Sequence, residues 1–517
     1  MNKTTDKYLY QTDKKEINFR MWMAFAGIES FAMSSLGYLY MFKTIDELDF
    51  VDVERIASDT EKTKYCVNQL NLIGFSFSFD LDFLTIFQMF DKYKIPYKAE
   101  ERDENYPLIF AGGPVVSCNP EPYSAFFDFF IIGDGEDINV KIIHIINENK
   151  DKSKNELLEL LAKVDGIYVP ALKNNVKKLT KSPLDCIYTP ILSDRAYFKN
   201  TFIIEVERGC ANCCGFCLAS YLNLPVRFIN NDELLKTVEL GLKNTNKIAL
   251  LGAQISAHPN FENICEYIYS RIQNGENIEM TLSSLRVDAV NEKIIKTLAA
   301  SGQKTSTLAI EAGSERLRKI INKNITEEQI LKAVKIAREN GLKGLKFYGM
   351  LGLPTETKDD LDELVRLAKR IKSENKGFEI NFGFSTFVPK PHTPFQWFGR
   401  ESTKNLEKKA QYIKKELHKI GIKASVSSAK WDYWQAVISR GDSTICDFLI
   451  DVYKNGGKLG AFSSAAKKYK INTDYYALEN YDFEKILPWD FIKIHPGKEH
   501  LIKENQRLLN STVYIGV

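Results

Sequence analysis

Short apolar runs alternate with amphipathic or charge-rich runs through the first 400 residues of this chain. Runs such as Leu72–Ser78 and Leu108–Pro114 are rich in aliphatic and aromatic residues, and the second breaks on two glycines, which predicts buried strands. The run Leu81–Tyr93, between them, reads as a helix. Strand–helix alternation of this kind predicts a parallel sheet, with ligands bound beyond the carboxyl ends of its strands.

The same alternation resumes after residue 200 with longer, charged helices, as in a β/α barrel. The predicted helices include Thr326–Gly341 and Lys358–Ser373. The predicted strands are Thr201–Val206, Lys247–Ala253, Glu279–Arg286, Gln303–Ile310, Gly344–Gly352 and, as the last of the series, Glu379–Val388. After residue 400 the chain begins a Lys-rich amphipathic helix, Asn405–Ile420, which is typical of a solvated surface.

These patterns predict an α/β protein of several parts. We expect an N-terminal Rossmann-like parallel sheet over residues 1–160 and a linker containing three X-Pro steps over 161–199. A partial β/α (TIM-like) barrel should follow over residues 200–400. A small, mostly helical C-terminal subdomain is expected over 401–517, and its last stretch, from Trp489 to Val517, is expected to cover the barrel.

Composition indicates an ordinary globular protein. Of 517 residues, 44% are hydrophobic and 26% are charged, and the net charge of +3 gives no general attraction to nucleic acid or membranes. Nine cysteines, four of them in one short stretch, favour a reducing compartment over a disulfide framework. The apolar run Met21–Phe42 contains Glu29 and several serines and glycines, so we predict strand, loop and helix there instead of a membrane span. We expect a cytoplasmic protein.

The most specific chemical signal is a cysteine array that follows the predicted strand Thr201–Val206. Cys210, Cys214 and Cys217 stand in a C-x-x-x-C-x-x-C spacing, and neighbouring thiolates favour zinc, copper(I) or an iron–sulfur cluster. A structural zinc site or an ordinary cubane cluster would need a fourth protein ligand, and none follows nearby in the sequence. Three ligands on a four-iron cluster would leave one iron open for a cofactor or substrate.

This array resembles that of the radical S-adenosylmethionine (SAM) superfamily. The resemblance implies a [4Fe-4S] cluster held by Cys210, Cys214 and Cys217, with an aromatic residue, Phe216, just before the third cysteine. It also implies that the open iron binds the amino and carboxylate groups of SAM. Cys213 has the wrong spacing to Cys217 and is left out of the ligand set. Buried thiols or a zinc knuckle remain the alternative.

The resemblance extends along the predicted barrel and implies SAM contacts where its strands end. Near Glu311 and Arg316 we expect the ribose and carboxylate, for which the planar fork of an arginine is suited. The other implied contacts are Gly252 and Ala253 at the amino group, Ser284 and Arg286 after the third strand, and Gly352 beside the adenine. Any one of these polar residues could instead be a helix cap or a surface ion pair.

The N-terminal stretches resemble the cobalamin-binding domain found in one large class of radical SAM enzymes. Matching phrases include Gly74-Phe-Ser76, Ala111-Gly-Gly-Pro114 and Ile132-Gly-Asp-Gly-Glu136. They imply cobalamin contacts at Ser76, Gly112, Gly113 and Gly133, where glycine lets backbone approach a ligand; the alternative is that these glycines only form turns. No D-x-H-x-x-G occurs and His144 lies in a helical run, so the lower face of cobalamin would lack a histidine ligand.

The remaining phrases are less informative about chemistry. The run Phe387–Pro394 contains three prolines, which predicts a stiff loop presenting Lys390 and His392. Together with E-A-G-S-E-R-L-R at 311–318, it resembles an uncharacterised bacterial and archaeal subfamily that supplies no activity. The aromatic stretch Ala429–Trp434 reads as packing, with a substrate-facing wall as the alternative.

Three hypotheses of function follow from these features. The first is a cobalamin-dependent radical SAM enzyme that methylates an unactivated carbon. The second is a radical SAM enzyme that performs a rearrangement, oxidation or methylthiolation, and the third is a non-catalytic iron–sulfur protein. A reducing partner such as flavodoxin or ferredoxin and an unidentified small-molecule or peptide substrate are expected. Nucleic acid is disfavoured because the sequence shows no second cysteine cluster and no basic module.

Overall fold

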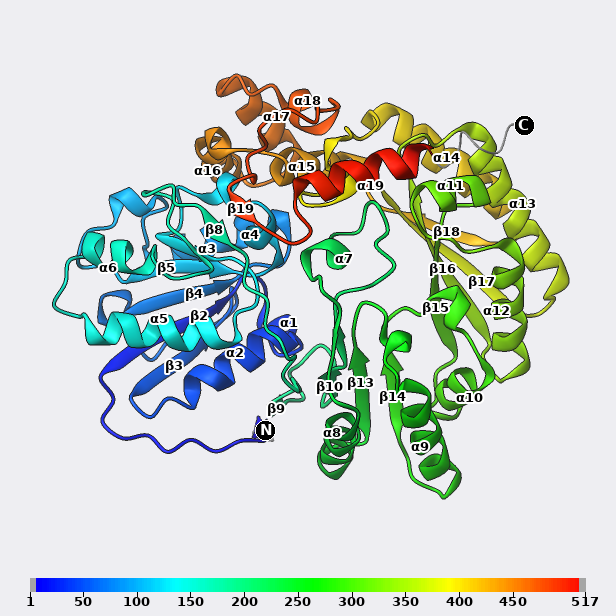
Figure 1. Ribbon diagram of the computed structural model, residues 1–517, viewed down its shortest axis with the longest axis horizontal. Coiled ribbons are helices and arrows are strands. Elements are labelled where there is room, and N and C mark those ends of the chain that lie inside the picture. The colour runs from blue at the N-terminus through cyan, green and yellow to red at the C-terminus, as the bar shows by residue number, and fades with distance from the viewer. Residues whose placement is uncertain (1–5, 511–517) are drawn as a thin grey trace.

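The computed structural model describes residues 6–510, and two parallel β-sheet layers dominate it. Figure 1 shows the N-terminal sheet and its helices on the left, an arc of strands and helices on the right, and C-terminal helices above both. This arrangement confirms the predicted α/β class with an N-terminal parallel sheet. Within the described range, no helix is long and apolar enough to cross a membrane.

The N-terminal sheet has six strands in the order β3-β2-β4-β5-β6-β7. Its strands are β2 (Phe19–Phe25), β3 (Val51–Ile56), β4 (Leu72–Ser76), β5 (Leu108–Gly112), β6 (Phe129–Ile131) and β7 (Ile167–Tyr168). All neighbours pair in parallel except β7, which is antiparallel to β6. The carboxyl ends of β2, β4, β5 and β6 therefore meet along one edge, where ligands of such sheets bind.

Side-chain alternation along β2 gives this sheet two buried faces. Met21 and Met23 pack with α2 (Leu36–Asp46), α5 (Glu136–Glu148) and α6 (Lys154–Leu161) on one face. Trp22 and Ala24 lie in the cluster on the opposite face, beneath α3 (Phe83–Tyr93). In α3 the buried positions recur at helical spacing, which explains why this run forms an amphipathic helix: Phe83, Ile86, Phe87 and Phe90.

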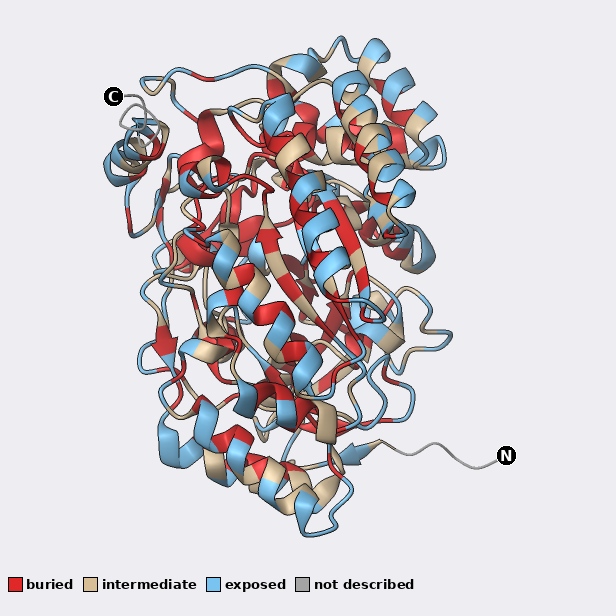
Figure 2. Cartoon of the chain, turned by 90° about the vertical axis from the view of Figure 1, so that its right-hand side faces the viewer, coloured by how far each residue is buried: buried red, intermediate tan, exposed pale blue. Residues whose placement is uncertain are grey.

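The second layer is an open arc of seven strands in two sheets. One sheet contains β10 (Phe202–Glu205), β13 (Lys247–Leu251) and β14 (Glu279–Leu282); the other contains β15 (Thr305–Glu311), β16 (Gly344–Leu351), β17 (Glu379–Thr386) and β18 (Lys423–Val426). A single bridge between Leu285 and Leu308 joins them. The helices α8 (Asn231–Asn244), α9 (Phe261–Gln273), α10 (Glu292–Ala300), α12 (Glu327–Glu339), α13 (Lys358–Glu374) and α14 (Thr403–Lys419) cover the outside. Figure 2 shows their exposed outer residues above buried strands.

The arc contains one strand more than the sequence pattern predicted. The strand β18 follows α14 and pairs in parallel with β17, whereas Glu379–Val388 was expected to be the last strand. Its four residues are exposed or half-buried in alternation, so it carries no apolar run that the pattern could detect. The sheet therefore continues past residue 400, the boundary proposed from the sequence.

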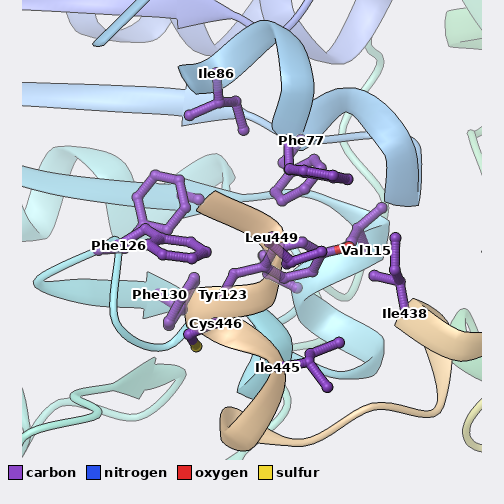
Figure 3. Packing of buried hydrophobic residues seen from close by; sticks show 14 of the residues in the cluster. Phe77, Ile86, Val115, Tyr123, Phe126, Phe130, Ile438, Ile445, Cys446 and Leu449 are labelled. Carbon is purple, nitrogen blue, oxygen red and sulfur yellow. The ribbon is translucent and has the colours of Figure 1, made fainter. Parts of the chain in front are cut away.

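The C-terminal helices pack against the N-terminal layer, except the last, which lies on the barrel. They are α15 (Ala429–Ser439), α16 (Cys446–Lys454), α17 (Leu459–Lys468), α18 (Thr473–Ala477) and α19 (Lys498–Asn510). Figure 3 shows side chains of α16 and its neighbours among those of the N-terminal layer: Ile438, Ile445, Cys446 and Leu449 beside Phe77, Ile86, Val115, Tyr123, Phe126 and Phe130. The helices α15 to α18 thus complete the core of the first sheet. The stretch from Trp489 was expected to cover the barrel, and within it α19 lies against barrel residues, with Leu508 in one cluster with Leu317 and Phe395 and Nδ2 of Asn505 donating to the carbonyl oxygen of Pro394.

Candidate functional site

The cysteine array lies on a loop whose two ends are held together. The short strands β11 (Glu207–Arg208) and β12 (Arg227–Phe228) pair in antiparallel fashion, with Arg208 opposite Arg227. Residues 209–226 form the loop between them. Gly209 turns the chain with φ of 95°, and a Cβ there would lie 2.6 Å from the carbonyl oxygen of Asn223. Glycine is therefore required at the start of the loop.

The three cysteines of the array occupy different surroundings on this loop. The sulfur of Cys210 lies 3.3 Å from Nδ2 of Asn212 and 3.5 Å from Oε1 of Gln254. Cys214 is buried, and its sulfur lies 3.8 Å from the carbonyl oxygen of Asn322. Burial raises the pKa of Cys214 to about 12 and also raises the pKa of Cys217. Binding of a metal group by these thiols would therefore release protons.

Cys213 serves the turn of the loop. It has a positive φ of 45°, and its carbonyl oxygen accepts hydrogen bonds from the Tyr221 hydroxyl at 2.9 Å and from Nδ2 of Asn322 at 3.1 Å. Its side chain is half-buried against the apolar cluster of the N-terminal sheet. The exclusion of Cys213 from the ligand set stays a prediction, and this packing is in keeping with it.

The array does not converge on a single point. Among residues 6–510, no three His, Cys, Asp or Glu side chains stand close enough together to hold one metal ion. A zinc ion draws its ligands to within about 2.3 Å of one centre. A four-iron cluster binds one thiolate at each of several irons, so its ligands are spaced more widely.

A set of charged residues from the barrel surrounds Cys214. Nζ of Lys323 lies 3.1 Å from Oε1 of Glu311, and Nη2 of Arg286 lies 3.1 Å from the carbonyl oxygen of Lys323. Lys323 and Arg286 oppose the rise in the pKa of the Cys214 thiol that burial causes. Glu311 adopts a positive φ of 63°, at the point where β15 ends. The structure thus brings two predicted residues, Arg286 and Glu311, to the cysteine loop, together with Lys323, which the sequence did not signal.

A second group lies where β13 ends. A Cβ on Gly252 would come within 2.6 Å of Cγ of Glu207, and the Glu207 carboxylate accepts the backbone N–H of Gln254. Burial raises the pKa of Glu207 to about 7, and its Oε2 is buried without a hydrogen-bond partner. The hydroxyl of Ser283 donates to the carbonyl oxygen of Gly252 at 3.1 Å. The predicted neighbour Ser284 is exposed, as is Ala253.

The other predicted cofactor residues make contacts of their own in the structure. Arg316 binds the carboxylate of Asp360 and the carbonyl oxygen of Thr355, the latter at 2.9 Å, so it is paired with α13 and not with Glu311. Gly352 has φ of 77°, and a Cβ there would lie 2.4 Å from Cδ2 of Leu406. Phe216 is a partly buried member of a separate apolar cluster that includes Phe387 and Phe395.

The predicted cobalamin contacts all line one cavity of about 370 Å³. Ser76, Gly112, Gly113 and Gly133 contribute the carboxyl edge of the N-terminal sheet. The opposite wall comes from the second layer and its cysteine loop, through Glu205, Arg208, Leu222 and Asn223. The cavity therefore lies between the sheet edge and the segment that carries the cysteines.

The glycines of this cavity have two different roles. Gly113 (φ 120°) and Gly133 (φ 107°) have left-handed backbones, and a Cβ would lie 2.5 Å from the Phe77 carbonyl oxygen and 2.2 Å from that of Leu179, respectively. Both are required by the protein's own backbone, as the turn alternative proposed. At Gly112 the nearest atom to an added Cβ, on Ile131, is 3.7 Å away, so Gly112 leaves space inside the cavity.

An ion-pair network forms the boundary between the cavity and the cysteine loop. Asp134 lies 2.9 Å from Nη1 of Arg208 and 2.5 Å from Nη1 of Arg227. Arg208 also contacts Glu136 at 2.7 Å and Glu205 at 2.7 Å. Burial alone would raise the pKa of Asp134, but the two arginines outweigh it and hold that pKa below its ordinary value. The phrase Ile132–Glu136 had signalled this turn without indicating its partners.

The proline-rich loop after β17 contacts the N-terminal layer. Nζ of Lys390 lies 2.6 Å from Oδ2 of Asp80, and the same oxygen accepts a hydrogen bond from Nε2 of Gln435 at 2.9 Å. Nε2 of His392 lies 3.0 Å from the carbonyl oxygen of Cys118, and burial lowers the pKa of His392 to about 4. The loop thus fastens layers together. No histidine is among the described residues lining the cavity, and His144 packs on Phe50.

Two family models match the chain, one in each of the layers described above. The family model "Radical SAM proteins, N-terminal" matches residues 40–170, and the model "Radical SAM superfamily" matches residues 204–368. An uncharacterized protein of Methanocaldococcus jannaschii is 33% identical over 407 residues, which cover 77% of this chain and 85% of that protein.

More distant relatives carry functional names. An uncharacterized methyltransferase of Pyrococcus horikoshii is 26% identical over 313 residues, covering 56% of this chain and 64% of that protein. A threonylcarbamoyladenosine tRNA methylthiotransferase of Aquifex aeolicus is 23% identical over 270 residues, covering 50% and 63%. The cobalamin-dependent S-adenosylmethionine radical enzyme OxsB, solved with aqua-cobalamin and S-adenosylmethionine bound, has a TM-score of 0.55 at 15% identity and covers 95% of this chain and 79% of that chain. At that identity the likeness shows a shared fold.

Proposed function

Because this chain belongs to the radical SAM superfamily, we propose that it is a cobalamin-dependent radical SAM enzyme that methylates an unactivated carbon. One observation carries the cobalamin part of the proposal. The cavity of about 370 Å³ is lined on one side by the edge of the N-terminal sheet and on the other by residues that flank the cysteine loop. A cofactor held there would face the cluster site directly.

The cysteine loop has the donors that a [4Fe-4S] cluster needs. Cys210, Cys214 and Cys217 supply thiolates at separated points, and Lys323 and Arg286 place positive charge next to Cys214. Positive charge beside a thiolate favours its ionised, metal-binding form. On the cofactor side, Glu207 and Gly252 lie close together at the end of β13, where the amino group of SAM is expected. A carboxylate is a suitable acceptor for an ammonium group.

The cavity residues also fit a corrinoid. Gly112 leaves open volume at the end of β5, and Glu136 has a buried oxygen without a hydrogen-bond partner. The cavity of about 370 Å³ would take one edge of a corrinoid ring with its side chains, and the rest of the molecule would extend out of it. When bound, the cluster and SAM supply radical chemistry for hydrogen-atom abstraction, and cobalamin supplies a methyl group. The protein's contribution is to hold these groups together and to exclude water from the space between them.

The proposal is tested by anaerobic reconstitution followed by turnover with methyl-deuterated SAM. We expect about four irons per chain and a corrinoid that can be extracted and identified by mass spectrometry. With a true substrate, label should enter the product while S-adenosylhomocysteine and 5′-deoxyadenosine form in equal amounts. Deoxyadenosine formed alone, with no label in the product, would contradict methylation and leave the radical assignment intact.

Methylthiolation is the second candidate, because one relative is a tRNA methylthiotransferase. A product that gains sulfur together with a methyl group in the same assay would select it. For either reaction we propose a reducing partner such as flavodoxin or ferredoxin and a small-molecule or peptide substrate.

A further inference from the structure

The cavity between the two layers contains one buried carboxylate that is only half satisfied. Glu136 opens the thirteen-residue helix α5 and is 6% exposed. Its Oε1 lies 2.7 Å from Nη1 of Arg208, while its Oε2 is shielded from solvent and has no hydrogen-bond partner. An unpaired buried polar atom is costly, and more so when the group is charged.

The neighbouring polar groups of the cavity are occupied. Oγ of Ser117 accepts the backbone N–H of Gly133 at 2.9 Å. Nζ of Lys178 donates to the carbonyl oxygen of Leu179 at 3.0 Å and to Oγ1 of Thr180 at 3.1 Å. Both oxygens of Glu205 accept from Arg208, at 3.0 and 2.7 Å. Among the described residues that line the cavity, Glu136 is the one with a buried side-chain atom left unpaired.

The charges of the lining indicate what kind of group can complete Glu136. The cavity is lined by three carboxylates, of Asp134, Glu136 and Glu205, and by two cations, of Lys178 and Arg208. An ionised carboxylate can only accept hydrogen bonds. A ligand with an N–H donor would therefore satisfy Oε2, and a ligand with a carboxylate at that place would be repelled.

We propose that Glu136 is the specificity-determining residue of the cavity and that it accepts a hydrogen bond from a primary amide on the ligand. This inference rests on the proposed function, since a corrinoid carries primary amides around the edge of its ring. Glu136 selects amide-bearing corrinoids over precursors whose side chains are carboxylates. The same carboxylate contacts Arg208, which stands two residues before Cys210, so the amide contact is made beside the cysteine loop.

The test is a titration of the full-length protein with a corrinoid, in which binding is measured by the change in visible absorption. The variant Glu136→Gln replaces the free acceptor by a group that can present an N–H to the cavity, and it should bind cobyric acid, which is rich in amides, about tenfold or more weakly. The matched control is Asp137→Asn, which removes a carboxylate from the next residue of α5; Asp137 does not line the cavity, and its side chain is 75% exposed beside Lys181. It should bind as the wild type does, within about threefold.

A second corrinoid tests the role of the amides in the wild-type protein, without any substitution. Cobyrinic acid carries carboxylates in place of the amides, so the wild-type protein should bind it at least tenfold more weakly than cobyric acid. Glu136→Gln should narrow that difference. Equal losses of affinity in the Glu136 and Asp137 variants would overturn the assignment of Glu136 alone. A wild-type protein with equal affinity for cobyric and cobyrinic acid would do the same. A wild-type protein that binds neither cobyric acid nor cobalamin would overturn both this inference and the cobalamin part of the proposed function.

Discussion

Asp134 fastens both ends of the cysteine loop to the N-terminal sheet, and its removal should loosen that loop selectively. Its carboxylate contacts Arg208 at 2.9 Å before the loop and Arg227 at 2.5 Å after it, and it accepts the backbone N–H of Lys181 at 2.7 Å. The side chain of Asp134 is 8% exposed and that of Arg227 is 5% exposed. In Asp134→Ala, the guanidinium of Arg227 would remain buried without a carboxylate partner. It would keep hydrogen bonds to backbone carbonyl oxygens, which do not neutralise its charge.

The size of the effect follows from this burial. Removing one partner of a buried ion pair costs about 3–5 kcal/mol. Arg208 keeps Glu136 and Glu205, so the lower end, about 3 kcal/mol, applies. The matched control is Asp137→Ala, because Asp137 binds Nζ of Lys181 at 2.7 Å but its side chain is 75% exposed. Loss of an exposed pair costs roughly 0–1 kcal/mol.

Hydrogen exchange followed by mass spectrometry measures this locally. Peptides covering residues 209–226 should exchange about a hundredfold faster in Asp134→Ala, since local opening becomes about 3 kcal/mol easier. Peptides of α12 and α13, on the far side of the arc, should be unchanged, and Asp137→Ala should match the wild type throughout. Equal protection of the loop in both variants would refute the view that Asp134 holds it, and uniform loss over the whole chain would indicate a general folding defect.

Three further outcomes are expected. Alanine at any ligand of the array should abolish cluster iron and 5′-deoxyadenosine formation, whereas Cys213→Ala should keep both; an iron-free Cys213→Ala protein would contradict the ligand assignment for Cys210, Cys214 and Cys217. Gly112→Leu should fill the cavity and lower corrinoid occupancy several-fold, while Gly460→Leu, on an exposed helix position with open space, should not. Burial raises the pKa of the Asp82 carboxyl to about 7 in the folded protein, above its value of about 4 in the unfolded chain. The contribution of Asp82 to stability is therefore fully present below about pH 4 and is lost as the pH rises through about 7. Asp82→Asn should therefore raise the melting temperature at pH 7.5 and not at pH 4, and a shift of equal size at both would contradict the raised pKa.

The strand pattern could be predicted because buried strands carry continuous apolar runs. The predicted run Lys247–Ala253 became β13, Lys247–Leu251, and Leu108–Pro114 became β5. The strand β18 was not predicted, because half of its residues face solvent and it lacks a continuous apolar run. The place of the C-terminal helices could not be predicted either. An apolar helix face shows that a partner exists, but not that Leu449 packs near Phe126, which precedes β6 and lies more than 300 residues earlier in the chain.

The candidate site shows the same division between local and distant information. Spacing identified the cysteines and the glycine-bearing strand ends, because those signals lie within short stretches. Ser284 was selected after the third strand, yet the contact to Gly252 comes from Ser283; a shift of one residue reverses the face to which a side chain points in extended chain. Arg316 was assigned to the cofactor by its type, and its pairing with Asp360 depends on how α13 packs.

Contacts at the cysteine loop connect the two proposed cofactor sites. Arg208 and Leu222 belong to the wall of the cavity, and Cys210 and Cys217 lie between them in sequence. The pairing of β11 with β12 closes this segment, so its two ends cannot shift independently. A ligand that orders the cavity wall also orders the cysteine loop, so that cluster binding then loses less conformational entropy. By thermodynamic reciprocity, cluster binding favours the cavity ligand to the same extent. Cobalamin binding and cluster binding should therefore reinforce one another, through contacts that include those of Asp134 with both arginines and those of Arg208 with Glu136 and Glu205.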